Sequence, residues 1–440
     1  MSWKRMILRL GLIAMIVLSF YLSYLIWLNP SNKTGTNDLN TSQSNQAGSD
    51  KEASPRSLAD VFLPLKLVSV SQSSAKETSS EVLIKKMVKT IESTKMTHPN
   101  VIEYPTLEAF NEKTQLKNGV ELTLMNEMAL SECINLFHLQ LTLDQAIKEK
   151  DLKFDHAQID YDSGTFRFLN SIKKTEVEAT FEGNFDTIKT LLKDSEANWY
   201  TVVSDTSLIS SQYLTNEPIK LKLYSYISSV QSYTIFRDSF FTNPSDAKSS
   251  DDSSDLMIVD QSEIMTVQTQ DSLVEFRDTN VTDINDNLYK ESYEYIRYLG
   301  TNYGNLRFMN RNGNAIDYRV FVEGYPVFSS NKEGLVATQF TKNRQSNSWS
   351  VRIDANMNTI QIPIPSDQTV ELPASRQVLE NLKNHGADLT KITAIVIGYK
   401  WNDIKDTGVV DLVPTWYINY DKQWKDHDSL VTELQESEGD

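Results

Sequence analysis

The sequence is poor in cysteine, histidine and positive charge. It has 440 residues but only one cysteine, Cys133, and five histidines. A single cysteine cannot form an internal disulfide bond, so the fold depends on its hydrophobic core. Lys and Arg number 43 against 59 Asp and Glu, which gives a net charge of −16 at pH 7. This excess of negative charge disfavours nucleic acids and anionic wall polymers as ligands of a basic groove.

The signature motifs of common enzymes are missing too. The chain has no G-x-S-x-G, H-E-x-x-H, Walker loop or G-x-G-x-x-G. The histidines stand singly, without a second His or Cys at metal-ligand spacing. We therefore expect no catalytic residue, no cofactor and no metal. His138, within the apolar stretch LFHLQL, and Cys133 are both expected in the core. A pair of carboxylates that hydrolyses a glycan stays open, because 59 acidic residues allow many pairings.

One string resembles a calcium-binding loop. Asp283, Asn285, Asn287 and Glu294 match positions 1, 3, 5 and 12 of an EF-hand. Position 6 is Leu288, although the sharp turn there requires glycine. Asn and Asp at the start of a helix explain the string without a metal. Weak metal binding at residues 283–294 stays open.

The chain does contain one long apolar run. Residues 10–28 carry no charged side chain, and a helix of 19 residues is about 29 Å long, close to the ~30 Å core of a bilayer. Lys4, Arg5 and Arg9 precede the run, and it ends in aromatic residues. The pattern predicts a retained, single-pass transmembrane helix in the cell membrane. Residues 1–9 would lie in the cytoplasm and all later residues outside the cell.

The rest of the chain divides by composition and pattern. Residues 29–57 are polar and lack aromatic side chains, which predicts a flexible tether. We predict a three-domain α+β ectodomain after it. Its parts are an N-terminal α+β domain at 58–206, a middle α+β domain at 207–312 and a C-terminal α+β domain at 313–440.

Local signals support this α+β reading. Thr78 and Glu81 form a T-x-x-E capping box ahead of a helix. The apolar residues of that helix recur at helical spacing and are expected in the core. They are Leu83, Ile84, Met87, Val88 and Ile91.

The second half of the chain repeats one order of elements. A strand (LVEFRD), a helix and a strand (NLRFMN) are followed by a strand (TIQIPIP), a helix and a strand (ITAIVIGYKW). The repeat predicts that the last two domains are related antiparallel sheets, each with a packed helix.

Several stretches resemble the YycH family of Gram-positive bacteria. They are VLSFYLSYLIWLNP near the start, EGYPVFSS with GLVATQF, and IVIGYKW with GVVDLVPTWYINYDKQW near the end. The resemblance implies a non-enzymatic accessory regulator of the essential WalK (YycG) sensor histidine kinase, which controls cell-wall homeostasis. It also implies a partner, YycI, and a membrane complex with the kinase. It does not fix whether the kinase is activated or restrained, and it carries no catalytic residue.

A protein of this kind acts by contact, so we looked for contact surfaces. Ser19 and Ser23 form a small-xxx-small face on the predicted span, which lets helices approach closely. Aromatic residues crowd the C-terminal strands, and those that point outward are candidates for a protein interface. The candidates are Tyr399, Trp401, Trp416 and Trp424. Self-association stays open.

Two other functions remain as alternatives. One is a module that binds a wall fragment or inhibits a protease in a cleft between domains. The other is a cell-wall hydrolase whose active site the sequence does not reveal.

Overall fold

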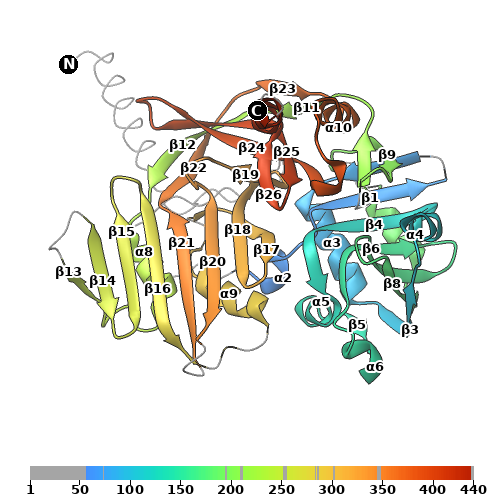
Figure 1. Ribbon diagram of the computed structural model, residues 1–440, viewed down its shortest axis with the longest axis horizontal. Helices are drawn as coiled ribbons and strands as arrows, with labels where there is room; N and C mark the ends of the chain where they lie inside the picture. Colours follow the sequence, from blue (N-terminus) through green and yellow to red (C-terminus); the bar gives the residue numbers. More distant parts are fainter. Residues whose placement is uncertain are drawn as a thin grey trace, which may run out of the picture. The chain divides into compact units, whose positions relative to one another are not determined.

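The computed structural model describes residues 56–72, 74–193, 196–208, 212–250, 255–282, 284, 287–300, 303–343 and 348–437. The predicted span, with Ser19 and Ser23, and the predicted tether up to residue 55 lie outside them. Within these ranges no helix is both long and apolar enough to cross a membrane. The described chain is a mixed α+β structure with two large sheets, which confirms the α+β class (Figure 1).

The first sheet has ten strands and uses residues 66 to 215. Its pairings are antiparallel except for the short pair β3–β5. In spatial order the strands are β10 (Gln212–Thr215), β9 (Tyr200–Asp205), β2 (Ser74–Thr78), β1 (Lys66–Ser71), β4 (Asn118–Ala129), β6 (Lys153–Asp160), β7 (Thr165–Asn170), β8 (Thr175–Phe181), β3 (Lys95–Glu103) and β5 (Gln140–Leu141).

The two faces of this sheet differ, because alternate residues of a strand point to opposite sides. One face packs on the main hydrophobic core, and the other carries polar residues beside a smaller apolar cluster that includes Val68 and Val70. On β6, Ala157 and Ile159 belong to the hydrophobic core, whereas the alternating His156 and Gln158 line a polar pocket. Six helices lie among the described residues between 56 and 215. They are α2 (Leu58–Val61), α3 (Glu81–Glu92), α4 (Leu107–Thr114), α5 (Leu130–Leu136), α6 (Gln145–Lys148) and α7 (Phe185–Leu191).

The structure confirms the helix that the apolar spacing predicts, but its N-cap residue differs from the predicted one. All five apolar residues expected in the core are buried. The N-cap, however, is Ser80, whose hydroxyl oxygen accepts a bond from the Leu83 amide. Thr78 accepts a bond from the Ser80 amide instead, so it stabilises the turn before the helix. The shift leaves the Glu81 carboxylate free for contacts outside the helix.

His138 lies outside the core, contrary to expectation. It follows α5 with a φ of 51°, and this left-handed turn leaves its side chain exposed while Phe137 and Leu139 are buried. Cys133 on α5 is buried as expected, with 4% of its surface exposed.

The second sheet has fourteen strands. All of them lie between residues 224 and 426, and helices connect some of them. Along its main path the order is β13 (Lys248–Ser250), β14 (Leu256–Asp260), β15 (Glu263–Gln268), β16 (Leu273–Val281), β21 (Trp349–Asn356), β20 (Leu335–Lys342), β18 (Ala315–Val322), β19 (Tyr325–Phe328), β24 (Ile392–Ile404), β25 (Val409–Tyr420), β12 (Tyr224–Val230) and β22 (Asn358–Ile364). Two further strands pair at its side, β17 (Leu306–Asn312) with β18 and β26 (Gln423–Asp426) with β25.

A separate two-stranded sheet and four α-helices complete this part. The small sheet is β11 (Ile219–Lys222) with β23 (Thr369–Leu372). The helices are α8 (Tyr233–Phe240), α9 (Leu288–Ile296), α10 (Ser375–Asn384) and α11 (His427–Ser437), with a 3-10 turn η2 (Leu389–Lys391).

Strand pairing joins segments that are far apart in sequence. The order β16–α9–β17 and the order β22–α10–β24 follow the repeat that the sequence predicts. In space, however, β16 pairs with β21, and β12 lies between β25 and β22. A cut between residues 312 and 313 therefore separates paired strands. The domain limits remain predictions.

Candidate functional site

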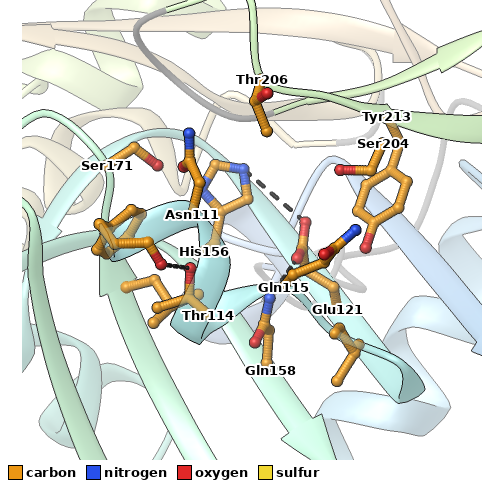
Figure 2. A pocket seen from close by; sticks show the side chains of 13 residues that line it. Asn111, Thr114, Gln115, Glu121, His156, Gln158, Ser171, Ser204, Thr206 and Tyr213 are labelled. Atoms are coloured by element: carbon orange, nitrogen blue, oxygen red, sulfur yellow. Dashed lines mark hydrogen bonds and ion pairs between the residues drawn. The ribbon is translucent and has the colours of Figure 1, made fainter. Parts of the chain in front are cut away.

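A small polar pocket opens on the polar face of the first sheet, next to α4 (Figure 2). Its cavity volume is about 30 Å³, which is room for one or two water molecules. Its principal polar residues are Asn111, Gln115, Glu121, His156, Gln158 and Tyr213. A cavity of this size does not accommodate a wall disaccharide or a peptide.

Strand register places the acidic and basic groups of the pocket together. Glu121 on β4 lies directly opposite Gln158 on β6, and Gln158 Nε2 donates to Glu121 Oε2 at 2.7 Å. His156 Nε2 lies 3.9 Å from Glu121 Oε1, and His156 Nδ1 lies 2.9 Å from Asp155 Oδ1. Burial opposes protonation of this imidazole, but Asp155 and Glu121 outweigh it and raise the pKa of His156 to about 9.

This protonation state decides what the pocket can do chemically. Ser171 also lines the pocket, so a serine and a histidine lie in one cavity. An imidazolium with a pKa of about 9 is protonated at neutral pH and cannot accept a proton from a serine hydroxyl. The oxygens Asn111 Oδ1 and Gln158 Oε1 are buried without a protein partner, and ordered water suits both. The geometry fits a hydrated structural cluster.

Three of the four aromatic candidates pack inside the fold. Tyr399, Trp401 and Trp416 expose 1%, 8% and 5% of their surfaces. Their polar atoms also bond within the chain, since Trp416 Nε1 donates to Pro373 O at 2.9 Å and Trp401 Nε1 donates to Asp403 Oδ1 at 2.9 Å. These side chains hold the β24–β25 hairpin against the elements that cover it.

Trp424 is the fourth candidate and is only partly buried. It lies on β26, with its ring centre 5.9 Å from that of Phe328. Phe328 stacks on Tyr417 at 3.8 Å between ring centres. These residues belong to a hydrophobic cluster that also contains Leu65 of the N-terminal part and Met309 of β17. Trp424 therefore lies beside a contact between the two large sheets.

A second set of contacts joins the sheets, and we call it the junction. It consists of Arg56, Ser79, Glu81, Asn305, Arg307 and Gly324. Arg307 on β17 exposes 1% of its surface, and its Nη2 donates to Leu63 O and Pro64 O at 2.9 Å each. Asn305 Nδ2 donates to Glu81 Oε2 at 2.8 Å. The junction therefore ties α3 and the segment before β1 to β17.

Arg56 and Gly324 complete the junction. Arg56 Nη2 pairs with Glu81 Oε1 at 3.0 Å, while Arg56 Nη1 donates to Leu306 O at 3.0 Å. Gly324 has a φ of +82°, and a Cβ at this position would lie 2.0 Å from Ser79 O. Sequence reasoning missed these residues. The signals were a lone arginine in the apolar strand NLRFMN and a glycine in the turn EGYP.

The structure describes only part of the calcium-like string. Asp283 and Asn285 lie outside the described residues. Asn287 is the N-cap of α9, and its side-chain oxygen accepts a bond from the Lys290 amide at 3.1 Å. In the part of the chain that the structure covers, no three His, Cys, Asp or Glu side chains gather as metal ligands.

Comparison with known proteins identifies the family. Residues 210–433, just over half of the chain, match the family model described as YycH protein, C-terminal domain. The fold is similar to that in "Crystal Structure of YycH from Bacillus subtilis", with a TM-score of 0.67, 16% sequence identity, and coverage of 86% of this chain and 98% of that one. No curated protein matches the chain. The matched residues, together with this shared fold, show that the chain belongs to the YycH family.

Proposed function

We propose that this protein is a non-enzymatic accessory regulator of the WalK (YycG) sensor histidine kinase and acts in a membrane complex with the kinase and YycI. Membership of the YycH family is the observation that carries the proposal. In this proposal one N-terminal span anchors the chain in the cell membrane, and the two-sheet part lies outside the cell. Two-component control of cell-wall metabolism is the process it serves.

Regulation then depends on contacts that differ between the kinase states. A bound protein shifts an equilibrium only by the difference between its affinities for the two states. The predicted span, with Ser19 and Ser23 on one face, supplies one contact surface. Trp424, which is partly exposed beside the contact between the sheets, is the aromatic candidate for an extracellular one. The buried Tyr399, Trp401 and Trp416 would support that surface from within.

In this proposal the junction transmits a movement of the predicted span to both sheets. Arg56, at the end of the predicted tether, is the first residue that the structure describes, and it contacts Glu81 on α3 and Leu306 on β17. Tyr293 on α9 donates its hydroxyl proton to the Arg56 carbonyl oxygen. A displacement of the tether would therefore act on both sheets at the same point.

The alternatives receive less support from the described site. A module that binds a wall fragment or inhibits a protease needs a deep cleft, and the polar pocket has a volume of only about 30 Å³. With a raised pKa of about 9, His156 does not serve as a general base for the nearby Ser171. Neither observation favours these functions over regulation by contact.

Photo-crosslinking in intact membranes tests the proposal. A photoreactive amino acid at position 19, 23 or 424 should join the chain to the kinase or to YycI, identified by mass spectrometry. Tyr298 is a matched control for Trp424, because it is an aromatic residue with 55% of its surface exposed, in the turn after α9. Ser19→Leu with Ser23→Leu should lower co-purification of the kinase. Unchanged recovery together with unchanged transcription of kinase-controlled genes would refute contact through the span.

A further inference from the structure

Five polar side chains of the first sheet lie buried next to α4. Glu121 on β4, Gln158 on β6 and Arg167 on β7 lie opposite one another in register, so they point to the same face. His156 on β6 and Glu176 on β8 lie in the next row of that face. We call these five residues the charged layer, and each exposes 6% of its surface or less. Charged side chains are rarely buried this deeply, which makes the layer unusual for a sheet face.

The polar groups of the charged layer are satisfied only in part. Gln158 Nε2 donates to Glu121 Oε2 at 2.7 Å. The ion pairs across the layer are longer, with 3.9 Å from His156 Nε2 to Glu121 Oε1 and 3.9 Å from Arg167 Nε to Glu176 Oε1. Arg167 Nε and Gln158 Oε1 are buried without a hydrogen-bond partner among the described residues. Burial of ionised groups is unfavourable where pairing is incomplete, so the layer opposes the closed position of whatever covers it.

Helix α4 is attached to the sheet by few contacts. Phe110 is its one buried apolar side chain, whereas α3 buries five. Leu116, just after the helix, is buried as well and belongs to a small apolar cluster. Among the described residues, a single hydrogen bond joins α4 to the sheet, from Arg167 Nη1 to the Lys113 carbonyl oxygen at 3.3 Å. The helix therefore has two apolar anchors and one polar anchor.

Polar space separates the helix from the charged layer. Asn111 and Thr114 of α4 line the cavity on one side, and Glu121, His156 and Gln158 line it on the other (Figure 2). Asn111 Oδ1 is buried without a protein partner, and the Thr114 hydroxyl donates to a carbonyl oxygen of its own helix. In the part of the chain that the structure describes, no hydrogen bond from either side chain reaches the sheet. The helix thus faces the layer across a space that fits water.

Both ends of the segment that contains α4 are held to the sheet. Before the helix, the Tyr104 amide donates to Lys174 O at 3.0 Å, and the Tyr104 hydroxyl donates to Glu176 Oε2 at 2.5 Å. After it, Asn118 Nδ2 on β4 donates to Asp162 Oδ1 at 2.8 Å. Residues 105–117 therefore form a flap with two fixed ends and a weakly attached middle.

We propose that residues 105–117 form a lid, which lifts from the charged layer while the rest of the fold stays closed. Segments with few buried apolar contacts open locally at a lower free-energy cost than global unfolding. Lifting also returns the charged layer to water, which relieves its incomplete pairing. Phe110 is the main anchor that keeps the lid closed, and the open lid joins the cavity of about 30 Å³ to solvent. This inference does not depend on the proposed contacts with the kinase or YycI.

Thiol labelling of the full chain tests the lid. Ser171 lines the cavity and exposes 3% of its surface, so Ser171→Cys places a thiol beneath the lid. Cys133 exposes 4% of its surface and belongs to the main core, so it reports opening of the whole fold in the same molecule. With iodoacetamide and mass spectrometry, position 171 should be alkylated at least about tenfold faster than Cys133. Equal rates at the two positions would overturn the proposal.

A second substitution ties this reaction to α4. Phe110→Leu in the Ser171→Cys chain weakens the anchor and should raise the rate at position 171 about tenfold, with no change at Cys133. Phe185→Leu is the matched control, because it makes the same change on α7, where Phe185 packs against the main core. The control should leave the rate at position 171 unchanged. An equal rise in the control, an unchanged rate with Phe110→Leu, or a parallel rise at Cys133 would each refute the lid.

Discussion

Glu81 Oε1 lies 3.0 Å from Arg56 Nη2, and the same carboxylate reaches Asn305 and Arg307 of the other sheet. The Glu81–Arg307 pair is the more buried one, since Arg307 exposes 1% of its side chain. Burial lowers the pKa of Arg307 to about 10, while Glu81 acts in the opposite direction. The arginine remains charged at neutral pH, so it needs this carboxylate.

Loss of the Glu81 charge should therefore destabilise the fold more than loss of an ordinary surface charge. We expect Glu81→Gln to lower the free energy of unfolding by about 2 kcal/mol, because it leaves a buried guanidinium without its carboxylate. Lys89→Ala, an exposed site on the same helix, is the control and should change stability by less than about 0.5 kcal/mol. Urea unfolding measures both. Equal stabilities of the two variants would contradict this role for Glu81.

Position 324 should tolerate no side chain, because Gly324 lies close to the backbone of Ser79. Gly324 and Gly313 both have positive φ, so alanine carries a similar backbone cost of about 1 kcal/mol at either site. Only at Gly324 would the added Cβ meet a backbone oxygen, at 2.0 Å. Gly324→Ala should therefore lose at least about 2 kcal/mol more than Gly313→Ala. Thermal unfolding of the two variants compares them directly, and similar melting temperatures would refute the contact.

His156 should make stability depend on pH in the alkaline range. Its pKa is raised from 6.5 to about 9 in the folded state, chiefly by Asp155 and Glu121 against the opposing effect of burial. A raised pKa stabilises the fold fully below pH 6.5, and the contribution is lost as the pH rises through 9. The stability advantage over His156→Gln should thus shrink by about 3 kcal/mol between pH 6 and pH 9.5.

Urea titrations at several pH values would follow this change. His98→Asn is a suitable control, because His98 is exposed and asparagine tolerates its φ of 54°. The control should track the natural protein across the same range. A constant difference between the natural protein and His156→Gln would show that the histidine is not the titrating group.

The Cys133 thiol should react with a label only after the chain unfolds, and we expect it to have no redox role. Burial raises the pKa of its thiol well above the usual range, so almost no thiolate exists at neutral pH. We expect a maleimide to leave the native chain unlabelled over hours and to label one thiol per chain in denaturant. Mass spectrometry counts the labels. Rapid labelling of the native protein would contradict the described position of α5.

Sequence patterns predicted the local elements well. The spacing of Leu83, Ile84, Met87, Val88 and Ile91 identified α3 and its buried face, because helical periodicity is a property of neighbouring residues. The cap was misplaced by two residues, since Ser80 and Thr78 both offer a hydroxyl near the start of the helix. His138 was misplaced for a similar reason, because its apolar neighbours do not reveal a left-handed turn.

Long-range contacts could not be predicted from the sequence. Arg307 bonds to the carbonyls of Leu63 and Pro64, more than 240 positions away in the chain. Nothing in the pattern of β12 indicates that it inserts between β25 and β22. The sequence shows that aromatic residues crowd the C-terminal hairpin, but composition does not tell which side of the hairpin is covered.

The place of β12 in the sheet has a consequence for biosynthesis. Residues 224–230 leave the ribosome well before residues 358–364 and 409–412, which flank them in the finished sheet. During synthesis this strand therefore has both edges unpaired until β22 is made, and one edge unpaired until β25 follows. A chain that stops before residue 358 leaves Tyr224–Val230 without either neighbour, which exposes this strand to proteolysis and aggregation.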